Sequence, residues 1–127
     1  MNVLLDTHTF FWWFSDATKL SKRAVSIIGN RSNTALVSAA TAWELAIKVN
    51  LGKIDALGLV VELGRYAEEE GFTELPISIE HAARAGLLPS HHRDPFDRLL
   101  VAQAQALHLP ILSADRVLDQ YDINRLW

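Results

Sequence analysis

Short apolar segments of the kind found in strands alternate along this chain with longer segments whose apolar residues recur with the period of an α-helix. This alternation is typical of an α/β fold in which a mainly parallel central sheet is flanked by helices. We expect strands at residues 2–5, 35–38, 72–77, 110–113 and 123–127. The third is expected at an edge of the sheet, because Pro76 has no amide hydrogen to donate to a ladder.

Helices are expected between these strands. The predicted spans are residues 7–14, 18–29, 41–50, 56–70, 79–86, 95–108 and 115–120. Ser21 is a candidate cap inside the second span, and Gly71 ends the fourth. Asp94 followed by Pro95 is a strong start signal for the sixth.

The bulk properties predict one soluble domain over residues 1–127. Half of the residues are hydrophobic, no repeat or linker interrupts the chain, and cysteine is absent. The absence of cysteine excludes disulfides, zinc–thiolate sites and cysteine nucleophiles. No apolar run reaches the roughly 20 residues that span a bilayer. The first residues carry no basic segment before Asp6, so we expect neither a signal peptide nor membrane attachment, and a cytoplasmic location.

Four acidic residues occupy related places in the predicted fold. Asp6 follows the first strand, and Asp115 follows the strand near residue 112. Glu44 lies in the helix that leaves the second strand, and Asp97 lies in the first turn of the long helix. Residues just beyond the carboxyl ends of parallel strands meet at one edge of the sheet, where ligands bind. We therefore expect these four acids to form one site.

Each acid alone also has a purely structural explanation. Asp6 and Asp115 are placed to cap the helices that follow them. Asp97 and Asp94 fit a capped first turn. Glu44 is placed to form an ion pair with the lysine one helical turn later, Lys48.

The group of acids is harder to explain in that way, because neighbouring carboxylates repel each other and raise one another's pKa values. A hard divalent cation such as Mg²⁺ relieves this repulsion, since it prefers oxygen ligands. A bound Mg²⁺ also activates water against a phosphodiester. The net charge of −3 agrees with this hypothesis, because a nucleic-acid substrate then needs cations to supply positive charge.

Competing functions are poorly supported by motifs. The sequence contains no Walker-type loop, no G-x-G-x-x-G, no G-x-S-x-G and no H-E-x-x-H. His91 and His92 are interpreted as a solvated loop pair. A DNA nuclease, a phosphatase or a non-catalytic binding module remain alternatives, although Asp6-Thr7-His8 lacks the D-x-D of phosphatases with an aspartyl nucleophile.

Four ordered motifs carry a resemblance to a known family. They are Leu4-Leu5-Asp6-Thr7, SAATAWEL at residues 38–45, HRDPFDRLLVAQA at residues 92–104 and Leu112-Ser113-Ala114-Asp115. In their order and spacing the chain resembles the PIN-domain ribonucleases, and more narrowly the VapC-type toxins of prokaryotic toxin–antitoxin pairs. The resemblance implies a three-layer PIN-like α/β fold and an endoribonuclease that depends on Mg²⁺ or Mn²⁺.

The resemblance also implies roles for single residues. It makes Asp6, Glu44, Asp97 and Asp115 the catalytic and metal-binding set. The resemblance implies that Asp6 and Asp97 bind the metal directly and that the other two complete the site directly or through water. Three neighbours are candidates for supporting this set. They are Thr7 and Ser113, whose hydroxyls match positions that steady the acids, and Asp94, a possible substitute for Asp97.

Partners follow from the same resemblance. Such toxins cut RNA, form homodimers and bind an antitoxin along a hydrophobic groove, often with a basic antitoxin side chain reaching the acidic site. The five consecutive aromatics at residues 10–14 favour an interface, with burial by other parts of the chain as the alternative. Candidate contacts to RNA phosphates are Lys48, Lys53, Arg93 and Arg98.

Overall fold

A parallel sheet forms the centre of the computed structural model, which describes residues 1–91 and 94–127. Within these residues the strands pair in the order β3-β2-β1-β4-β5, and every pairing is parallel. Their bounds are β1 Asn2–Leu5, β2 Thr34–Ser38, β3 Thr73–Leu75, β4 Ile111–Leu112 and β5 Arg125–Leu126. The predicted parallel sheet is confirmed, and so is the edge position of the third strand, which ends just before Pro76.

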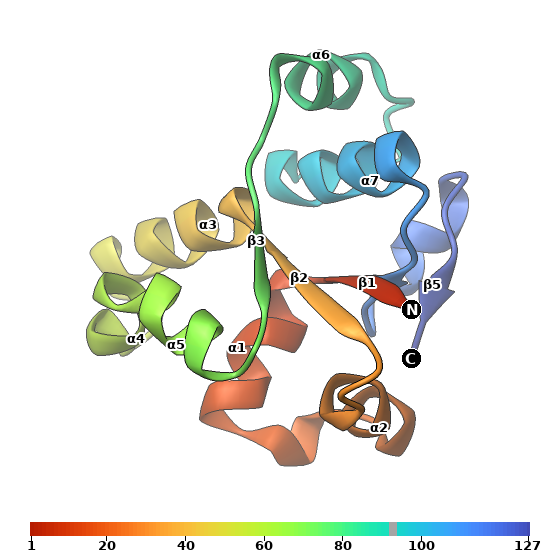
Figure 1. Ribbon diagram of the computed structural model, residues 1–127. Helices are drawn as coiled ribbons and strands as arrows, with labels where there is room; N and C mark the ends of the chain where they lie inside the picture. Colours follow the sequence, from red (N-terminus) through yellow and green to blue (C-terminus); the bar gives the residue numbers. More distant parts are fainter. Residues whose placement is uncertain (92–93) are drawn as a thin grey trace.

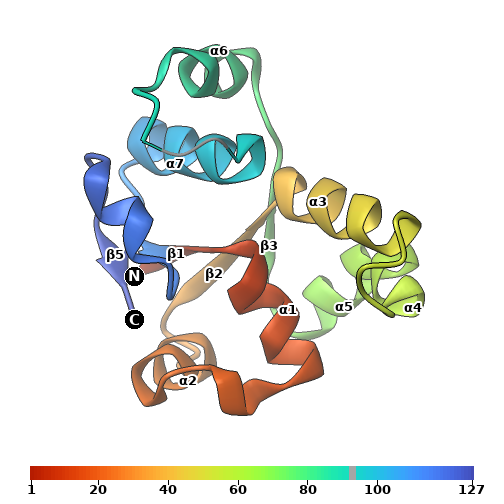
Figure 2. The same ribbon diagram turned by 180° about the vertical axis from the view of Figure 1, so that it is seen from behind.

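Helices cover both faces of this sheet (Figures 1 and 2). They are α1 Thr7–Ser15, α2 Lys22–Gly29, α3 Ala39–Asn50, α4 Leu57–Val61, α5 Leu63–Glu69, α6 Ile79–Leu87 and α7 Pro95–Leu107, with 3₁₀ helices η1 Ala17–Lys19 and η2 Arg116–Gln120. In both views α1 and α2 lie on one side of the sheet, and α6 and α7 lie on the other. The three-layer α/β fold is thus confirmed.

Successive side chains of the central strand β1 point alternately into two hydrophobic cores, one on each face of the sheet. Val3 and Leu5 pack with Phe10 of α1 in one hydrophobic cluster. Leu4 points to the other face and packs with Leu100 of α7. All of these side chains are completely buried. This alternation follows from the two-residue period of a strand, and it makes β1 the strand on which both layers are built.

Two predicted helices are each divided in the structure. The span 18–29 contains η1 and then α2, which begins after Ser21; the Ser21 hydroxyl accepts the amide of Ala24 at 3.0 Å. The span 56–70 contains α4 and α5, separated at Glu62, whose backbone leaves the helical region. Only α5 buries residues fully in the core, so packing rather than local pattern sets this break. Residues 115–120 form a 3₁₀ helix.

The aromatic run at residues 10–14 contacts the chain's own core. Phe10 is fully buried, and the other four members are half-buried against the same cluster. The ring of Phe14 lies 6.2 Å from that of Phe72, and the ring of Trp12 lies 6.2 Å from that of Trp127. Other parts of the chain therefore pack on this run, as the intrachain alternative predicts.

Among the described residues, no helix combines the length and the apolar character that crossing a membrane requires.

Candidate active site

The candidate site lies where β2, β1 and β4 end side by side. Leu5 pairs with Leu112 in the parallel register, and the amide of Asp6 donates to the carbonyl oxygen of Leu112 at 3.1 Å. Asp6 and Ser113 are therefore the first residues beyond two neighbouring strands. Helices α1 and α3 leave from this same edge, which brings residues far apart in sequence to one place.

Asp6 is buried, and both of its carboxylate oxygens are engaged. Oδ1 accepts the amide of Thr7 at 2.8 Å, and Oδ2 accepts the hydroxyl of Ser113 at 2.8 Å. Burial raises the pKa of Asp6, and the negative charge of Glu44 adds to this, although the bonds from Ser113 and Thr7 oppose the shift. Asp6 is thus a helix cap, as its structural explanation predicts, and its carboxyl group is also held in one orientation.

Glu44 has one paired and one unpaired carboxylate oxygen. Its Oε2 lies 2.8 Å from the ammonium of Lys48, which confirms the predicted ion pair. Its Oε1 is buried and has no hydrogen-bond partner in the part of the chain that the structure describes. Leaving a buried acceptor unsatisfied costs about 1–3 kcal/mol, and more when it is charged. The ion pair with Lys48 therefore satisfies only one of the two carboxylate oxygens of Glu44.

The negative charges of the other site acids all act on Asp97. Burial, followed by the negative charges of Asp6, Asp94, Glu44 and Asp115, raises the pKa of Asp97 to about 8. The structure therefore brings the four predicted acids and Asp94 into one electrostatic environment. Without a cation, this environment favours the protonated form of Asp97 at neutral pH.

Asp94 and Asp115 make the cap contacts that their positions predict. Oδ1 of Asp94 accepts the amides of Phe96 at 2.8 Å and Asp97 at 3.3 Å, so Asp94 is the N-cap of α7. Oδ1 of Asp115 accepts the amide of Val117 at 3.0 Å, at the start of η2. The amide of Asp115 also donates to the Ser113 hydroxyl at 3.0 Å, which ties Asp115 to the residue that holds Asp6.

The donor set fits a hydrated divalent cation. Within residues 1–91 and 94–127, no three histidine, aspartate or glutamate side chains are arranged to hold a metal ion by themselves. Mg²⁺ does not need such a cluster, because it keeps several waters and is usually held by one or two carboxylates together with substrate phosphates. The carboxylate oxygens, their mutual repulsion and the unpaired Oε1 of Glu44 all match that mode of binding.

Two polar residues near the strand ends were not anticipated from the sequence. The hydroxyl of Thr41 lies 3.1 Å from that of Thr7, so Thr7 supports Asp6 through its amide and not through its hydroxyl. Gln103 is fully buried, accepts the hydroxyl of Ser38 at 2.6 Å and donates to the carbonyl of Pro76 at 3.1 Å. The sequence did contain a signal for Gln103, because a glutamine stands there within the apolar stretch of α7.

The candidate RNA contacts divide into three groups. The guanidinium of Arg98 donates to the carbonyl oxygens of Ala85 at 2.9 Å and Leu88 at 3.0 Å, and so fastens the end of α6 to α7; its contact to RNA stays a prediction. Arg93 and His92 lie outside the described residues. Lys48 and Lys53 line a hollow beside Glu44, and they remain candidates.

Comparisons with known proteins agree with this architecture. Residues 3–124 match the family model described as the PIN domain. No sequence among the curated proteins matches the chain.

Among solved structures, the chain is similar to VapBC2 from Rickettsia felis bound to a DNA fragment from their promoter (TM-score 0.72, 13% identity, covering 99% of this chain and 98% of that one). It is also similar to DNA-bound VapBC from Salmonella typhimurium (TM-score 0.72, 16% identity, covering 99% of this chain and 97% of that one). A third similar structure is a toxin-antitoxin complex from Klebsiella pneumoniae (TM-score 0.60, 19% identity, covering 91% of this chain and 89% of that one). At these identities the likeness establishes the fold.

Proposed function

Because the chain belongs to the PIN domain family, we propose that it is a metal-dependent endoribonuclease and the toxin of a type II toxin–antitoxin system. The observation that carries the proposal is a buried carboxylate oxygen, Oε1 of Glu44, without a partner among the described residues. It lies in a site where burial and then four other acids raise the pKa of Asp97. A fold that gathers several acids at one sheet edge is best explained by a cation that binds there.

In this proposal each acid has a defined role. Asp6 and Asp97 bind the ion directly, and Glu44 and Asp115 complete the site directly or through water. When bound, Mg²⁺ or Mn²⁺ supplies positive charge that lowers the pKa of a water nucleophile and neutralises the phosphodiester. Ser113 fixes the orientation of Asp6, while Lys48 stays beside Glu44 and adds a cation next to the substrate phosphates.

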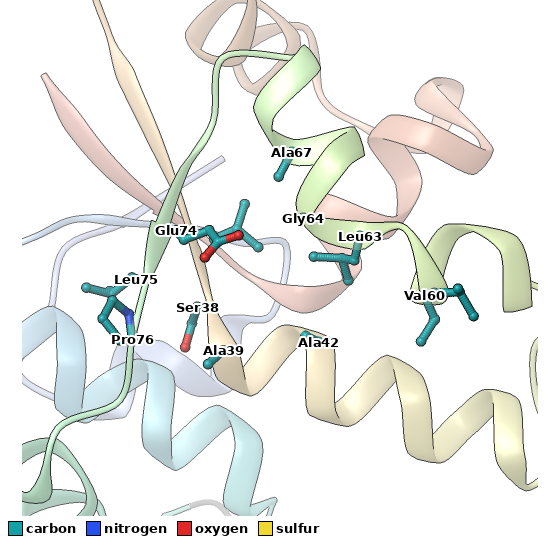
Figure 3. A pocket seen from close by; sticks show the side chains of 12 residues that line it. Ser38, Ala39, Ala42, Val60, Leu63, Gly64, Ala67, Glu74, Leu75 and Pro76 are labelled. Atoms are coloured by element: carbon teal, nitrogen blue, oxygen red, sulfur yellow. The ribbon is translucent and has the colours of Figure 1, made fainter.

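We propose that the antitoxin binds an apolar groove of about 390 Å³ beside the open edge of β3 (Figure 3). Figure 3 shows the side chains of Val60, Leu63 and Leu75 around it, with the carboxylate of Glu74 near its centre. A groove with apolar walls and one acid suits an apolar antitoxin segment that carries a basic side chain. The free strand edge offers main-chain groups to the same segment. A homodimer remains part of the proposal.

Cleavage of labelled RNA and DNA tests the function directly. The wild type, Asp6→Asn and Asp97→Asn are compared with Mg²⁺, with Mn²⁺ and with EDTA. Asp55→Asn is the matched control, because it makes the same change at an exposed acid outside the site. We expect RNA cutting by the wild type and the control, and loss of cutting in both site variants and in EDTA. Equal activity in the site variants would refute the site, and cutting of DNA alone would favour the DNA nuclease alternative.

A further inference from the structure

An aromatic pair, of which one member is exposed and the other half-buried, lies beside the candidate site. Trp43 precedes Glu44 in α3, and Phe96 precedes Asp97 in α7. Their ring centroids are 5.0 Å apart with an interplanar angle of 83°, an edge-to-face contact. Trp43 is nevertheless 56% exposed, whereas the other three tryptophans are half-buried in the chain's own core. A large aromatic that is held in place but left exposed is available to a ligand.

Two lysines lie next to this pair. A hollow of about 420 Å³ is lined by Phe96 together with Glu44, Lys48 and Lys53. The amide of Lys53 donates to the carbonyl of Lys48 at 2.9 Å, so the backbones of the two lysines are fixed to one another. The hollow thus adjoins the candidate site through Glu44 and Asp94, and its other walls carry the ring of Phe96, two lysines and the apolar residues Ile47, Leu51 and Pro95.

We propose that Trp43, supported by Phe96, is a stacking platform for one unpaired base of the RNA, with Lys48 and Lys53 beside the neighbouring phosphates. This inference rests on the proposed function and specifies its substrate as single-stranded at that position. Every base has a face that stacks on an aromatic ring, and phosphates next to it attract lysine. In a duplex the same base is already stacked and paired, so its faces are not available.

The hollow has both apolar and charged walls, since Ile47, Leu51 and Pro95 line it together with Lys48, Lys53, Glu44 and Asp94. A purely apolar protein segment placed there would remove those four charged groups from water. A nucleotide is aromatic on its base and anionic on its phosphate, which matches the ring of Trp43 and the lysines in turn.

Binding measured without cleavage tests the platform. All variants are made in the Asp6→Asn protein, and the affinity for short fluorescein-labelled oligouridylate and oligoadenylate is measured by fluorescence anisotropy with Mg²⁺ present. Trp43→Ala is expected to weaken binding about 5- to 100-fold, the usual effect of removing a stacking ring. Trp43→Phe is expected to retain most of the affinity. Ile79→Ala is the control, since Ile79 is 91% exposed on α6.

A series of oligonucleotides with one abasic position distinguishes stacking from a general loss of binding. With Trp43 present, one abasic position is expected to weaken binding by the same factor as Trp43→Ala. In the Trp43→Ala protein that abasic position is expected to have no further effect, because the two changes remove the same contact. Denaturation midpoints confirm that the variants are folded.

Three results would overturn the platform. One is unchanged affinity in Trp43→Ala, and another is additive loss at every abasic position. The third is a change of mass in light scattering together with unchanged RNA affinity, which would make Trp43 part of a protein interface. Cleavage assays on the Asp6-containing protein separate the two proposals. RNA cutting with no role for Trp43 in binding removes only the platform, whereas absence of RNA cutting removes the proposed function.

Discussion

The hydroxyl of Ser113 donates a 2.8 Å hydrogen bond to Oδ2 of Asp6, and the same hydroxyl accepts the amide of Asp115. One side chain after β4 thus links two candidate site acids that follow different strands. Because Oδ1 of Asp6 already accepts the amide of Thr7, the Ser113 bond leaves the carboxylate a single orientation. Side chains that hydrogen-bond to a metal ligand, without binding the metal themselves, commonly tune the affinity for the metal.

Replacing Ser113 with alanine should therefore weaken metal binding. Oδ2 of Asp6 would lose its donor, and we expect Mn²⁺ affinity and RNA cleavage to fall about 10- to 100-fold. Ser113→Thr keeps the hydroxyl and should retain both. Calorimetric titration with Mn²⁺ gives the affinity without reference to activity. Wild-type Mn²⁺ affinity in Ser113→Ala would contradict the role of this hydroxyl.

Asp97→Asn should stabilise the metal-free protein at alkaline pH. The folded-state pKa of Asp97 is raised from 3.8 to about 8 by burial and by the surrounding acids, so the folded protein holds this proton more tightly than the unfolded chain. The corresponding stability is present below pH 3.8 and is lost as the pH rises through about 8. At pH 9, asparagine should raise the free energy of unfolding by on the order of 2 kcal/mol.

Urea denaturation in EDTA across this pH range is the measurement for Asp97. The advantage of Asp97→Asn over the wild type should grow as the pH rises, and Asp55→Asn should show no such growth. If the free energies of unfolding of the wild type and Asp97→Asn differ by the same amount at every pH, ionisation of Asp97 does not destabilise the folded protein.

Mn²⁺ should raise the melting temperature of the wild type. A ligand that binds only the folded state adds about 2.7 kcal/mol to the free energy of unfolding at 100 times its Kd. Calorimetric scans with and without Mn²⁺ should show this increase in the wild type and in Asp55→Asn, but not in Asp6→Asn. An equal increase in Asp6→Asn would place the ion elsewhere.

Val61→Glu should weaken binding of the antitoxin. Val61 lines the apolar groove and is 70% exposed, so a charge there enters the proposed interface without entering the core. Loss of one apolar contact and burial of a new charge beneath the apolar antitoxin segment should raise the Kd about tenfold or more. Ile79→Glu, the same type of change at a more exposed residue of α6, should leave the Kd unchanged in surface plasmon resonance with the cognate antitoxin. Equal effects of both variants would refute this groove.

Features set by neighbouring residues were predictable from the sequence. The apolar runs placed β1 and β2, and Asp94 with Pro95 placed the start of α7, because a cap and a proline act within one helical turn. The grouping of Asp6, Glu44, Asp97 and Asp115 followed from strand order in a parallel sheet. These features depend on short-range chemistry or on general topology.

Features set by distant contacts were not predictable in the same way. The break between α4 and α5 depends on what α5 packs against, and the local pattern alone suggested one helix. Arg98 looked like a surface cation until α6 supplied carbonyl oxygens to its guanidinium. The contact of Thr7 with Thr41 spans 34 positions, and only the folded chain brings the two hydroxyls together.

The strand order also dictates when the candidate site is complete during synthesis. Asp6 directly follows the central strand β1, whose neighbour on one side is β4, and the second hydrogen-bond donor to Asp6 is Ser113. A nascent chain that still lacks residues 111–115 has no β4, no Ser113 and no Asp115 to set beside Asp6. A growing polypeptide therefore has the full set of acids only once residues 111–115 have been made, and Ser113 follows Asp6 by 107 positions.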